Sequence, residues 1–262
     1  MAIGERISAI IPSLREGRRL LESIRAARSA LGSCEVIVVA FGESANIRDA
    51  ARLEGVLWVE STKANRGHQL QLGAQHATGD LFIFVHADSR LPVAAAQLVR
   101  SAMSVSGVAG GAFRLQFDLG HPVLSMLSWL SRLRLTASFL GDQCLFCSRR
   151  AYLDAGGFHP EPLFEDVGFA RRLSGVGALV RLAASVTTSA RRFRSHGHVR
   201  QLVWNALLFA AFHLGASPRR LHELYEPGRR SGTHSRVQHR RGAGRRVDRR
   251  VVRVGSRRGA LQ

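Results

Sequence analysis

Apolar positions in the first half of the chain follow two alternating patterns. Four short apolar runs are typical of strands buried on both faces of a sheet. They occupy residues 7–12, 35–40, 57–60 and 81–85. Other segments carry apolar residues at helical spacing, and these are 18–31, 45–53, 67–77 and 93–105. Strands that alternate with helices predict an α/β fold, with a mostly parallel sheet and helices on both of its faces.

The pattern becomes less regular after Gly110-Gly111. Further strands are predicted at residues 112–118, 143–148 and 179–188. Further helices are predicted at 122–140, 151–156 and 166–173, followed by a long apolar helix at 199–214. We therefore expect one domain over residues 1–227, divided into 1–110, 111–198 and a C-terminal helical segment at 199–227.

Positive charge is concentrated at the C-terminus. The chain has 38 Lys and Arg against 19 Asp and Glu, a formal net charge of +19. Residues 228–262 contain 12 Arg and one Asp, which leaves +8 for residues 1–227. This Arg-rich segment has few large apolar residues to offset the entropy of ordering, so it is predicted to be disordered. It is interpreted either as a tether to a membrane or polyanion, or as the product of a shifted reading frame.

Cysteine usage and hydropathy indicate a cytoplasmic protein. Cys144 and Cys147 have C-x-x-C spacing, but no second pair completes a zinc site, so a structural role is favoured. The few cysteines fit a reducing compartment, and no signal peptide is recognisable. The longest apolar stretch, 202–216, is shorter than the roughly 20 residues that span a bilayer. Residues 199–214 either pack in the core or contact the inner face of the plasma membrane peripherally.

Acidic residues stand at three places where they can carry chemistry. Asp88 follows a predicted buried strand, and a carboxylate there can hold Mg²⁺ or Mn²⁺ or simply cap a turn. Glu165 and Asp166 are adjacent carboxylates. They can supply a general base, or they can simply favour the N-terminus of a helix. Asp142 precedes Gln143 at a turn, where it can orient an acceptor hydroxyl or serve the turn alone.

Cationic residues stand at two further places. Arg66, with Gln69, opens a predicted helix, where a phosphate can bind or where the residues are merely solvated. Arg191-Arg192 follows the last predicted strand and either clamps a diphosphate or forms a charged surface. The chain has no G-x-G-x-x-G after its first strand and no G-x-x-x-x-G-K-S/T. Their absence counts against dinucleotide-dependent enzymes and P-loop nucleotide triphosphatases.

Taken in chain order, these motifs resemble the family 2 glycosyltransferases of the GT-A fold over roughly residues 7–225. The motifs are Ile10-Ile11-Pro12-Ser13 with Glu16, Glu35-Val36-Ile37-Val38-Val39, Asn65-Arg66-Gly67 through Gly73-Ala74, Ala77-Thr78-Gly79-Asp80, His86-Ala87-Asp88, Gly110-Gly111-Ala112-Phe113, Gly141-Asp142-Gln143, Gly156-Gly157-Phe158, Glu165-Asp166 and Ser189-Ala190-Arg191-Arg192. They are most similar to a bacterial branch with H-A-D in place of D-x-D. Some members of that branch are linked to arsenosugar biosynthesis, and broadly similar sequences are labelled glycosyltransferases of carotenoid acids.

The resemblance implies a GT-A Rossmann-like fold and an inverting, metal-dependent sugar transfer. The donor is a nucleotide-sugar, UDP- or GDP-linked, and the acceptor is a hydroxyl or carboxyl of a small molecule or lipid. Residues 1–110 then bind the donor and residues 111–198 the acceptor. Asp88 holds the divalent cation, Mg²⁺ or Mn²⁺, and Asp166 deprotonates the acceptor with Glu165 beside it.

The resemblance also implies which side chains contact each substrate. Asp142 and Gln143 contact the acceptor. The donor contacts are Pro12, Ser13, Glu16, Glu43, Arg66, Gln69, His86, Asp88, Arg191 and Arg192.

Two positions depart from the pattern of the family. Ala40 stands after the second strand, where the family has an Asp that contacts the nucleotide, and Glu43 is the candidate substitute. Gln71 stands where the branch commonly has Asn. One alternative reading is therefore a non-catalytic homologue that binds a sugar nucleotide. A second alternative is a nucleic-acid-binding protein acting through the basic tail, although residues 1–227 contain no recognisable nucleic-acid module.

Overall fold

The computed structural model describes residues 6–132, 139 and 141–225, apart from the side chains of Arg192 and His196. The chain divides into two units, Met1–Pro227 and Gly228–Gln262. The predicted disorder of the basic tail concerns residues outside the described ranges. Everything that follows concerns the first unit.

The described residues form one eight-stranded sheet in the order β3-β2-β1-β4-β7-β6-β8-β5. The strands are β1 (Ile7–Leu14), β2 (Glu35–Phe41), β3 (Leu57–Glu60), β4 (Leu81–Phe84), β5 (Ser89–Arg90), β6 (Val108–Phe117), β7 (Phe146–Ser148) and β8 (Ala178–Thr188). The pairs β1–β2, β1–β4, β2–β3 and β6–β8 are parallel, whereas β7 and β5 are antiparallel to their neighbours. The predicted α/β fold is confirmed, and two short antiparallel strands make its sheet mixed.

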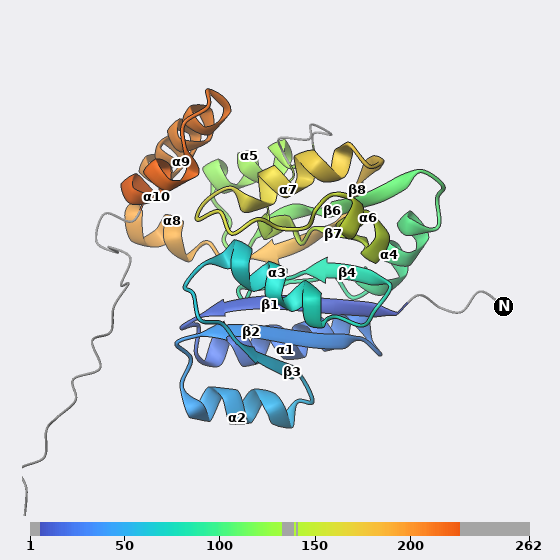
Figure 1. Cartoon of the computed structure of the whole chain (residues 1–262). Helices are drawn as coiled ribbons and strands as arrows, with labels where there is room; N and C mark the ends of the chain where they lie inside the picture. The colour runs from blue at the N-terminus through green and yellow to red at the C-terminus, as the bar shows by residue number, and fades with distance from the viewer. Residues whose placement is uncertain (1–5, 133–138, 140, 226–262) are drawn as a thin grey trace, which may run out of the picture. The chain divides into compact units, whose positions relative to one another are not determined.

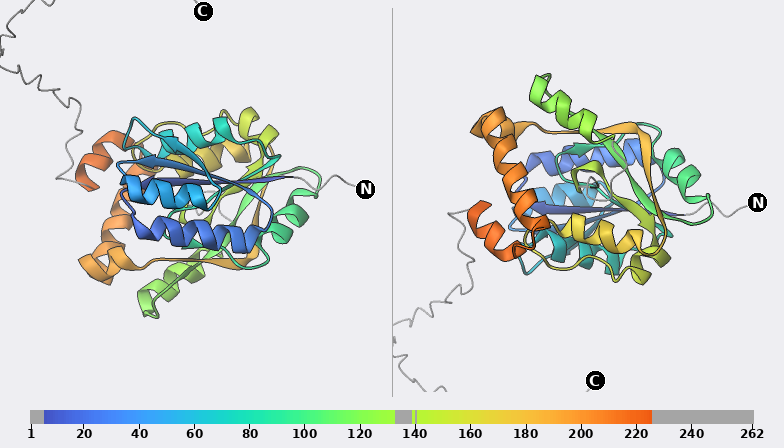
Figure 2. Two further views of the ribbon diagram at one scale, coloured as in Figure 1. Left: turned by 90° about the horizontal axis from the view of Figure 1, so that it is seen from below. Right: turned by 90° about the horizontal axis from the view of Figure 1, so that it is seen from above.

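Helices cover both faces of the sheet (Figures 1 and 2). Packed on one face are α1 (Arg18–Leu31), α2 (Ala45–Leu53) and α4 (Ala95–Met103). Packed on the other are α3 (Arg66–His76), α6 (Arg149–Asp154) and α7 (Glu165–Ser174). A third cluster joins α5 (Pro122–Leu130) to α8 (Arg191–His196) and α9 (His198–His213), and α10 (Pro218–Tyr225) packs on α9.

The alternation of side chains explains why β1 carries apolar residues on both of its faces. Ile7, Ala9 and Ile11 face the cluster under α1, whereas Ile10 faces the cluster under α3, and all four are fully buried. Successive residues of a strand point to opposite faces, so a strand covered on both sides is buried at every position. The buried polar residue Ser8 satisfies its hydroxyl by donating to the carboxylate of Glu35. Complete burial of a Leu, Ile or Phe side chain contributes about 1.5–3 kcal/mol, so these runs stabilise the middle of the sheet most strongly.

The strand predicted at residues 112–118 begins earlier than expected, at Val108. Gly110 and Gly111 lie inside β6 instead of before it. A Cβ at Gly110 would lie 2.3 Å from the carbonyl oxygen of Phe146, and one at Gly111 would lie 2.2 Å from that of Val180. The two glycines therefore permit close approach between neighbouring strands, a reason that sequence pattern alone does not reveal.

Two further boundaries were predicted incorrectly. The strand expected at 143–148 is present only from Phe146, because Gly141–Gln143 forms a 3-10 turn and Cys144 has a φ of 50°. The helix expected at 122–140 ends at Leu130, and residues 133–138 and 140 lie outside the described ranges. In the first of these places Cys144 and Leu145 are buried apolar residues that precede the strand without belonging to it, so hydrophobicity overestimated its length.

Cys144 and Cys147 are fully buried free thiols on opposite faces of the sheet. Burial raises the pKa of both thiols, which keeps them protonated and unreactive. Their C-x-x-C spacing therefore brings together neither a metal site nor a disulfide, in agreement with the structural role predicted for them.

Candidate functional site

The carboxyl ends of the parallel strands β1, β2 and β4 meet at one edge of the sheet, and α8 lies beside this edge (Figure 1). In open α/β sheets ligands bind outside the carboxyl ends of the strands. The loop after β1, the loop after β2 and His86-Ala87-Asp88 after β4 all belong to this edge. It is therefore the natural place for a functional site.

The carboxylate of Glu43 fixes the loop after β1 to the loop after β2. Its Oε1 accepts hydrogen bonds from the Ser13 hydroxyl at 2.7 Å and from the Glu16 N–H at 2.6 Å. Its Oε2 accepts one from the Gly17 N–H at 3.1 Å. Glu43 therefore shapes the loop that precedes α1, while its predicted contact with a donor stays a prediction.

Gln69 ties the ends of β1 and β2 together from α3. Its side-chain amide donates hydrogen bonds to the carbonyl oxygens of Ser13 at 2.7 Å and Val39 at 3.0 Å. Gln69, Ser13 and Pro12 are all buried. These three predicted donor contacts form the framework of the edge, and direct contact of their side chains with a donor stays a prediction.

Ala40 does not point into the edge. Its side chain is completely buried in the core cluster under α1 and α2, and its carbonyl oxygen accepts a hydrogen bond from the Ser61 N–H at 2.7 Å. A carboxylate nearby in sequence, Glu43, is the one engaged by the preceding loop. Ala40, at which the sequence departs from the pattern of the family, is therefore a core residue in this fold.

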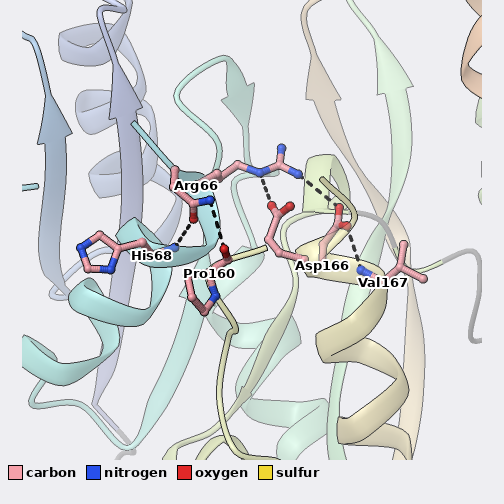
Figure 3. A network of polar contacts seen from close by, with 7 residues as sticks. Arg66, His68, Pro160, Asp166 and Val167 are labelled. Atoms are coloured by element: carbon pink, nitrogen blue, oxygen red, sulfur yellow. Dashed lines mark hydrogen bonds and ion pairs between the residues drawn. The ribbon is translucent and has the colours of Figure 1, made fainter. Parts of the chain in front are cut away.

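Arg66 forms ion pairs with both carboxylates of the E-D motif (Figure 3). Its Nε donates to Glu165 Oε1, and its Nη2 lies 3.6 Å from Asp166 Oδ2. Asn65 caps α3 by accepting from the His68 N–H at 2.7 Å, and it donates to the Pro160 carbonyl at 3.3 Å. These contacts attach the start of α3 to the segment that leads into α7.

Gly67 makes this attachment possible. A Cβ at this position would lie 2.2 Å from the His159 carbonyl oxygen and 3.2 Å from the Glu165 Cβ. The residue before Glu165, Phe164, has a φ of 60°, an uncommon conformation for a residue with a large side chain. The sequence Arg-Gly and the strained Phe-Glu-Asp turn therefore form one packed unit.

The pKa values of Glu165 and Arg66 are both raised within this unit, for different reasons. Burial raises the pKa of Glu165, and the neighbouring carboxylate of Asp166 adds to the increase against the effect of Arg66. Burial alone would lower the pKa of Arg66, but Glu165 and Asp166 outweigh it and raise that pKa. Asp166 Oδ1 also accepts from the Val167 N–H at 2.8 Å. These two contacts fix the position of the Asp166 side chain at the start of α7.

Asp142 belongs to the same electrostatic group. Burial, followed by the charges of Asp166 and Asp88, raises its pKa to about 7, although Arg66 opposes the shift. Within the described part of the chain, the Oδ1 atom of Asp142 is buried and has no hydrogen-bond partner. A buried carboxylate oxygen without a partner is costly unless a proton, a cation or a ligand satisfies it. Sequence motifs from three distant segments thus converge on one acidic site.

Arg181 is a residue of this site that the sequence analysis missed. It lies buried on β8, donates to Gln143 Oε1 and to the Phe113 carbonyl at 3.1 Å, and stacks 4.0 Å from the centre of the Phe139 ring. Burial lowers its pKa to about 10, an effect that the carboxylate of Asp142 opposes. The available signal was an arginine inside an otherwise apolar strand, a position that is rarely charged without a specific partner.

A cavity of about 570 Å³ adjoins Asp88 on the side of α1 and the end of β8. Its charged lining consists of the arginines Arg19, Arg90, Arg191 and Arg194 and the carboxylates Glu22, Asp88 and Asp118. Its polar lining includes the hydroxyl residues Thr187, Thr188, Ser189 and Ser195. The volume is in the range of ligand pockets, which is about 300–1,000 Å³. Asp88 therefore belongs both to this arginine-containing cavity and to the acidic group around Asp142.

Arg191 lies at this edge, where its Nη2 is 3.7 Å from Glu16 Oε2 in the loop after β1, and its contact with a phosphate stays a prediction. The side chain of Arg192 lies outside the described part of the structure. Arg90 forms an ion pair with Glu22 at 3.6 Å, and Arg194 forms one with Asp118 at 3.1 Å. The cavity arginines Arg19, Arg90 and Arg194 were not predicted, because they belong to α1, β5 and α8, which only the fold brings together.

The acidic residues fit a divalent cation only in combination with other ligands. Within the described ranges, no three His, Cys, Asp or Glu side chains form a group that could hold a metal by themselves. Mg²⁺ is commonly held by one or two carboxylates together with substrate phosphates and water. Asp88 suits that kind of site, because it supplies one carboxylate. Asp142, whose pKa the charge of Asp88 helps to raise, has a buried oxygen without a hydrogen-bond partner and could supply a second.

Comparison with known proteins identifies the fold. No family model and no curated protein sequence matches the chain. Among solved structures, the mannosyltransferase from Pyrobaculum calidifontis, in complex with GDP-Man and Mn²⁺, matches 86% of this chain and 70% of its own, with a TM-score of 0.58 and 17% identity. Glucosyl-3-phosphoglycerate synthase from Mycobacterium tuberculosis, in complex with Mn²⁺, UDP and glucosyl-3-phosphoglycerate, matches 79% of this chain and 79% of its own. The TM-score is 0.51 and the sequence identity is 17%. The chain has the GT-A fold.

A further GT-A structure, S. aureus TarS 1–349 with UDP-GlcNAc, matches 70% of this chain and 58% of its own, with a TM-score of 0.56 and 15% identity. At such identities the similarity establishes the GT-A fold and carries no residue assignment. The expected relation to family 2, to its bacterial branch and to arsenosugars therefore stays a prediction from sequence motifs.

Proposed function

We propose that this chain is an inverting glycosyltransferase that transfers a sugar from a UDP- or GDP-linked donor to a hydroxyl or carboxyl acceptor. The observation that carries the proposal is the convergence of Asp142, Glu165 and Asp166 on Arg66, next to Asp88 at the carboxyl edge of a GT-A sheet. Transfer to an acceptor needs a base and a site for a leaving diphosphate. This edge offers candidates for both.

The donor diphosphate is assigned to the side of Asp88 that faces the arginine-containing cavity. Arg191 and Glu16 lie together at this side, and the arginines of the cavity supply positive charge for phosphate oxygens. Asp88, with His86 before it, would hold a divalent cation. When bound, the cation stabilises the negative charge that develops on the leaving diphosphate.

The acceptor is assigned to the side of Asp142, Gln143 and Asp166. Asp166 takes the proton from the attacking oxygen while that oxygen bonds to the anomeric carbon and the bond from carbon to diphosphate oxygen breaks. One base suffices, because a single displacement inverts the anomeric centre without a covalent intermediate. Arg66 and Glu165 position Asp166, and Asp142, with a pKa near 7, can donate a hydrogen bond in its protonated form.

A second candidate function is binding of a sugar nucleotide without transfer. It rests on Ala40 and Glu43, because the first is a core residue and the second is engaged by the protein's own loop. The two functions make the same prediction for donor binding and opposite predictions for donor hydrolysis or transfer.

The deciding experiment measures nucleoside diphosphate release from a panel of UDP- and GDP-sugars, with Mn²⁺ or Mg²⁺ and with chelator. Binding of each donor is measured in parallel by calorimetry. We expect metal-dependent release from one donor, abolished in Asp166→Asn without loss of donor binding, and unchanged in the matched control Asp49→Asn on α2. Donor binding without release or transfer to any hydroxyl or carboxyl acceptor would favour the second function. Absence of all donor binding would refute both.

A further inference from the structure

Helix α9 carries apolar side chains on its buried and on its solvent-facing sides. Leu208 is buried against the domain, whereas Val199, Val203 and Leu207, spaced four residues apart, are more than half exposed. Trp204 lies beside them, with 38% of its surface exposed. A surface helix of a globular domain normally presents polar residues to solvent. The outward side of α9 is therefore an apolar stripe without a cover among the described residues.

Helix α5 extends this stripe. It exposes Met126, Trp129 and Leu130, and Trp129 has 58% of its surface exposed. The two helices contact each other, and the rings of His121 before α5 and His198 at the start of α9 stack with centroids 3.8 Å apart. We call these exposed side chains of the two helices the α5/α9 surface. Exposed apolar side chains gathered on two neighbouring helices mark an interaction site.

Positive charge accompanies the α5/α9 surface. Arg132 follows α5, Arg200 lies on α9, and Arg219 and Arg220 lie on α10, which packs against α9; all four are exposed. The chain then continues from α10 into residues 228–262, with 12 Arg and one Asp. Apolar and indole side chains beside arginines are the combination found in helices that lie in the interface of an anionic bilayer.

We propose that the α5/α9 surface docks on a membrane that contains anionic lipids, with Trp129 and Trp204 in the headgroup region. None of the described helices is long and apolar enough to cross a membrane, so docking places α9 along the lipid surface. The arginines of α9 and α10 contact lipid phosphates. A second copy of this chain is the less favoured occupant, because two such basic surfaces would repel each other.

The α5/α9 surface adjoins the acidic site. Phe212 and Phe209 of α9 pack on Phe164, with ring centroids 4.8 Å and 5.9 Å apart, and Phe164 directly precedes Glu165. If the proposed sugar transfer is correct, an acceptor embedded in the lipid layer enters beside Asp166. This last step rests on the proposed function, whereas docking itself does not.

The chain contains its own probes, because two of its three tryptophans lie on the α5/α9 surface. The third, Trp58 on β3, is buried, and its indole N–H donates a hydrogen bond to Glu60 Oε1 at 2.8 Å. Tryptophan fluorescence of the full chain is recorded with phosphatidylcholine vesicles and with vesicles containing phosphatidylglycerol, each with and without brominated acyl chains. We expect a blue shift and quenching by brominated lipid only with the anionic vesicles. The double variant Trp129→Phe/Trp204→Phe should lose this response and retain the emission of Trp58.

A matched pair of charge insertions tests the surface itself. Leu207→Glu on α9 should weaken binding to anionic vesicles about tenfold, whereas Leu53→Glu on α2, at a residue that is also largely exposed, should not change it. Co-sedimentation with vesicles without quenching would mean that the tail alone binds, and it would overturn the proposal. A dimer in sedimentation velocity that shields both tryptophans from iodide would overturn it in favour of self-association. Failure to bind any vesicle would also overturn it, and none of these outcomes depends on transferase activity.

Discussion

Arg66 and Glu165, which are 99 positions apart in the chain, form an ion pair that joins the start of α3 to the start of α7. The Glu165 side chain is only 1% exposed, and the pair is extended by Asp166. It connects the residues 1–110, predicted to bind the donor, with the residues 111–198, predicted to bind the acceptor. Any change at one end therefore alters the charge balance at the other.

Arg66→Ala should destabilise the protein strongly, because it leaves the buried carboxylate of Glu165 without its partner. Removing one member of a fully buried ion pair costs about 3–5 kcal/mol, and because the Arg66 side chain is 39% exposed the loss should lie near or below the lower end of that range. The measurement is the free energy of unfolding in urea. The control is Arg48→Ala on α2, whose ion pairs with Asp49 and Glu60 are exposed and should contribute about 0–1 kcal/mol.

The double variant Arg66→Ala/Glu165→Gln should recover part of the stability lost in Arg66→Ala, because the second change removes the unpaired charge. A double-mutant cycle isolates this coupling. Additive effects of the two substitutions would contradict the pairing of Arg66 with Glu165.

Gly67→Ala should destabilise the protein although alanine is the better helix former. Its Cβ would lie 2.2 Å from the His159 carbonyl oxygen, so α3 or the segment before α7 must shift, at a cost of about 1–3 kcal/mol. The matched control is Gly168→Ala in α7, where the nearest atom to an added Cβ lies at 3.4 Å. There the gain in helix propensity should raise stability by about 0.5–1 kcal/mol. Thermal unfolding that moves in the same direction for both variants would contradict the predicted close contact.

Asp142→Asn should raise stability more at pH 8 than at pH 5.5. The pKa of Asp142 rises from its ordinary value of 3.8 to about 7, so the folded state holds a proton that the unfolded state has released between these values. Stability of the native protein therefore falls as pH rises from about 4 to about 7 and is then constant for this group. Asn removes the loss, and the expected gain at pH 8 is on the order of 1–3 kcal/mol.

Unfolding in urea at the two pH values measures this gain. An equal effect of Asp142→Asn at pH 5.5 and pH 8 would show that Asp142 is not protonated in the folded state. Saturation with Mn²⁺ and nucleoside diphosphate should reduce the pH dependence of the native protein, because added positive charge near Asp88 favours ionised Asp142.

Asp88→Asn should weaken binding of UDP or GDP in the presence of Mn²⁺ at least tenfold and leave metal-free binding nearly unchanged. The reason is that Asp88 is proposed to hold the cation, whereas the arginines of the neighbouring cavity bind phosphate without it. Calorimetric titrations with Mn²⁺ and with chelator separate the two contributions. Equal affinities of Asp88→Asn and the native protein in Mn²⁺ would remove Asp88 from the proposed metal site.

Except for the two-residue strand β5, which was not predicted, the order of strands and helices in residues 7–105 follows from the sequence with small boundary errors. The apolar run 36–40 is uninterrupted because a strand of a sheet covered on both sides is buried on both of its faces. Helix α1 was predicted at its observed bounds because Leu20, Ile24 and Leu31 repeat on one face and Gly32 follows as a stop. In the structure Gly32 has a φ of 66°, a conformation that favours glycine. These signals are local, and local physics is sufficient to produce them.

The sequence also supplied the acidic candidates Asp88, Asp142, Glu165 and Asp166, but it could not show that they share one electrostatic site. Proximity depends on strand order, on the packing of α3 against α7 and on the close contact at Gly67. Arg181 was missed because its charge is meaningful only beside Gln143 and Asp142, which lie about 40 residues earlier in the chain.

The sequence by itself determined the α/β pattern, the basic tail and the residue types available for sugar-transfer chemistry. The tertiary structure decided which of those residues meet, that Ala40 faces the core and Gln69 braces two strand ends, and that the outward side of α9 remains apolar. The physical reason is the distance along the chain over which each feature acts. Helical and strand periodicity depends on residues that are close in sequence. Ion pairs, raised pKa values and exposed surfaces arise only between segments that folding brings together.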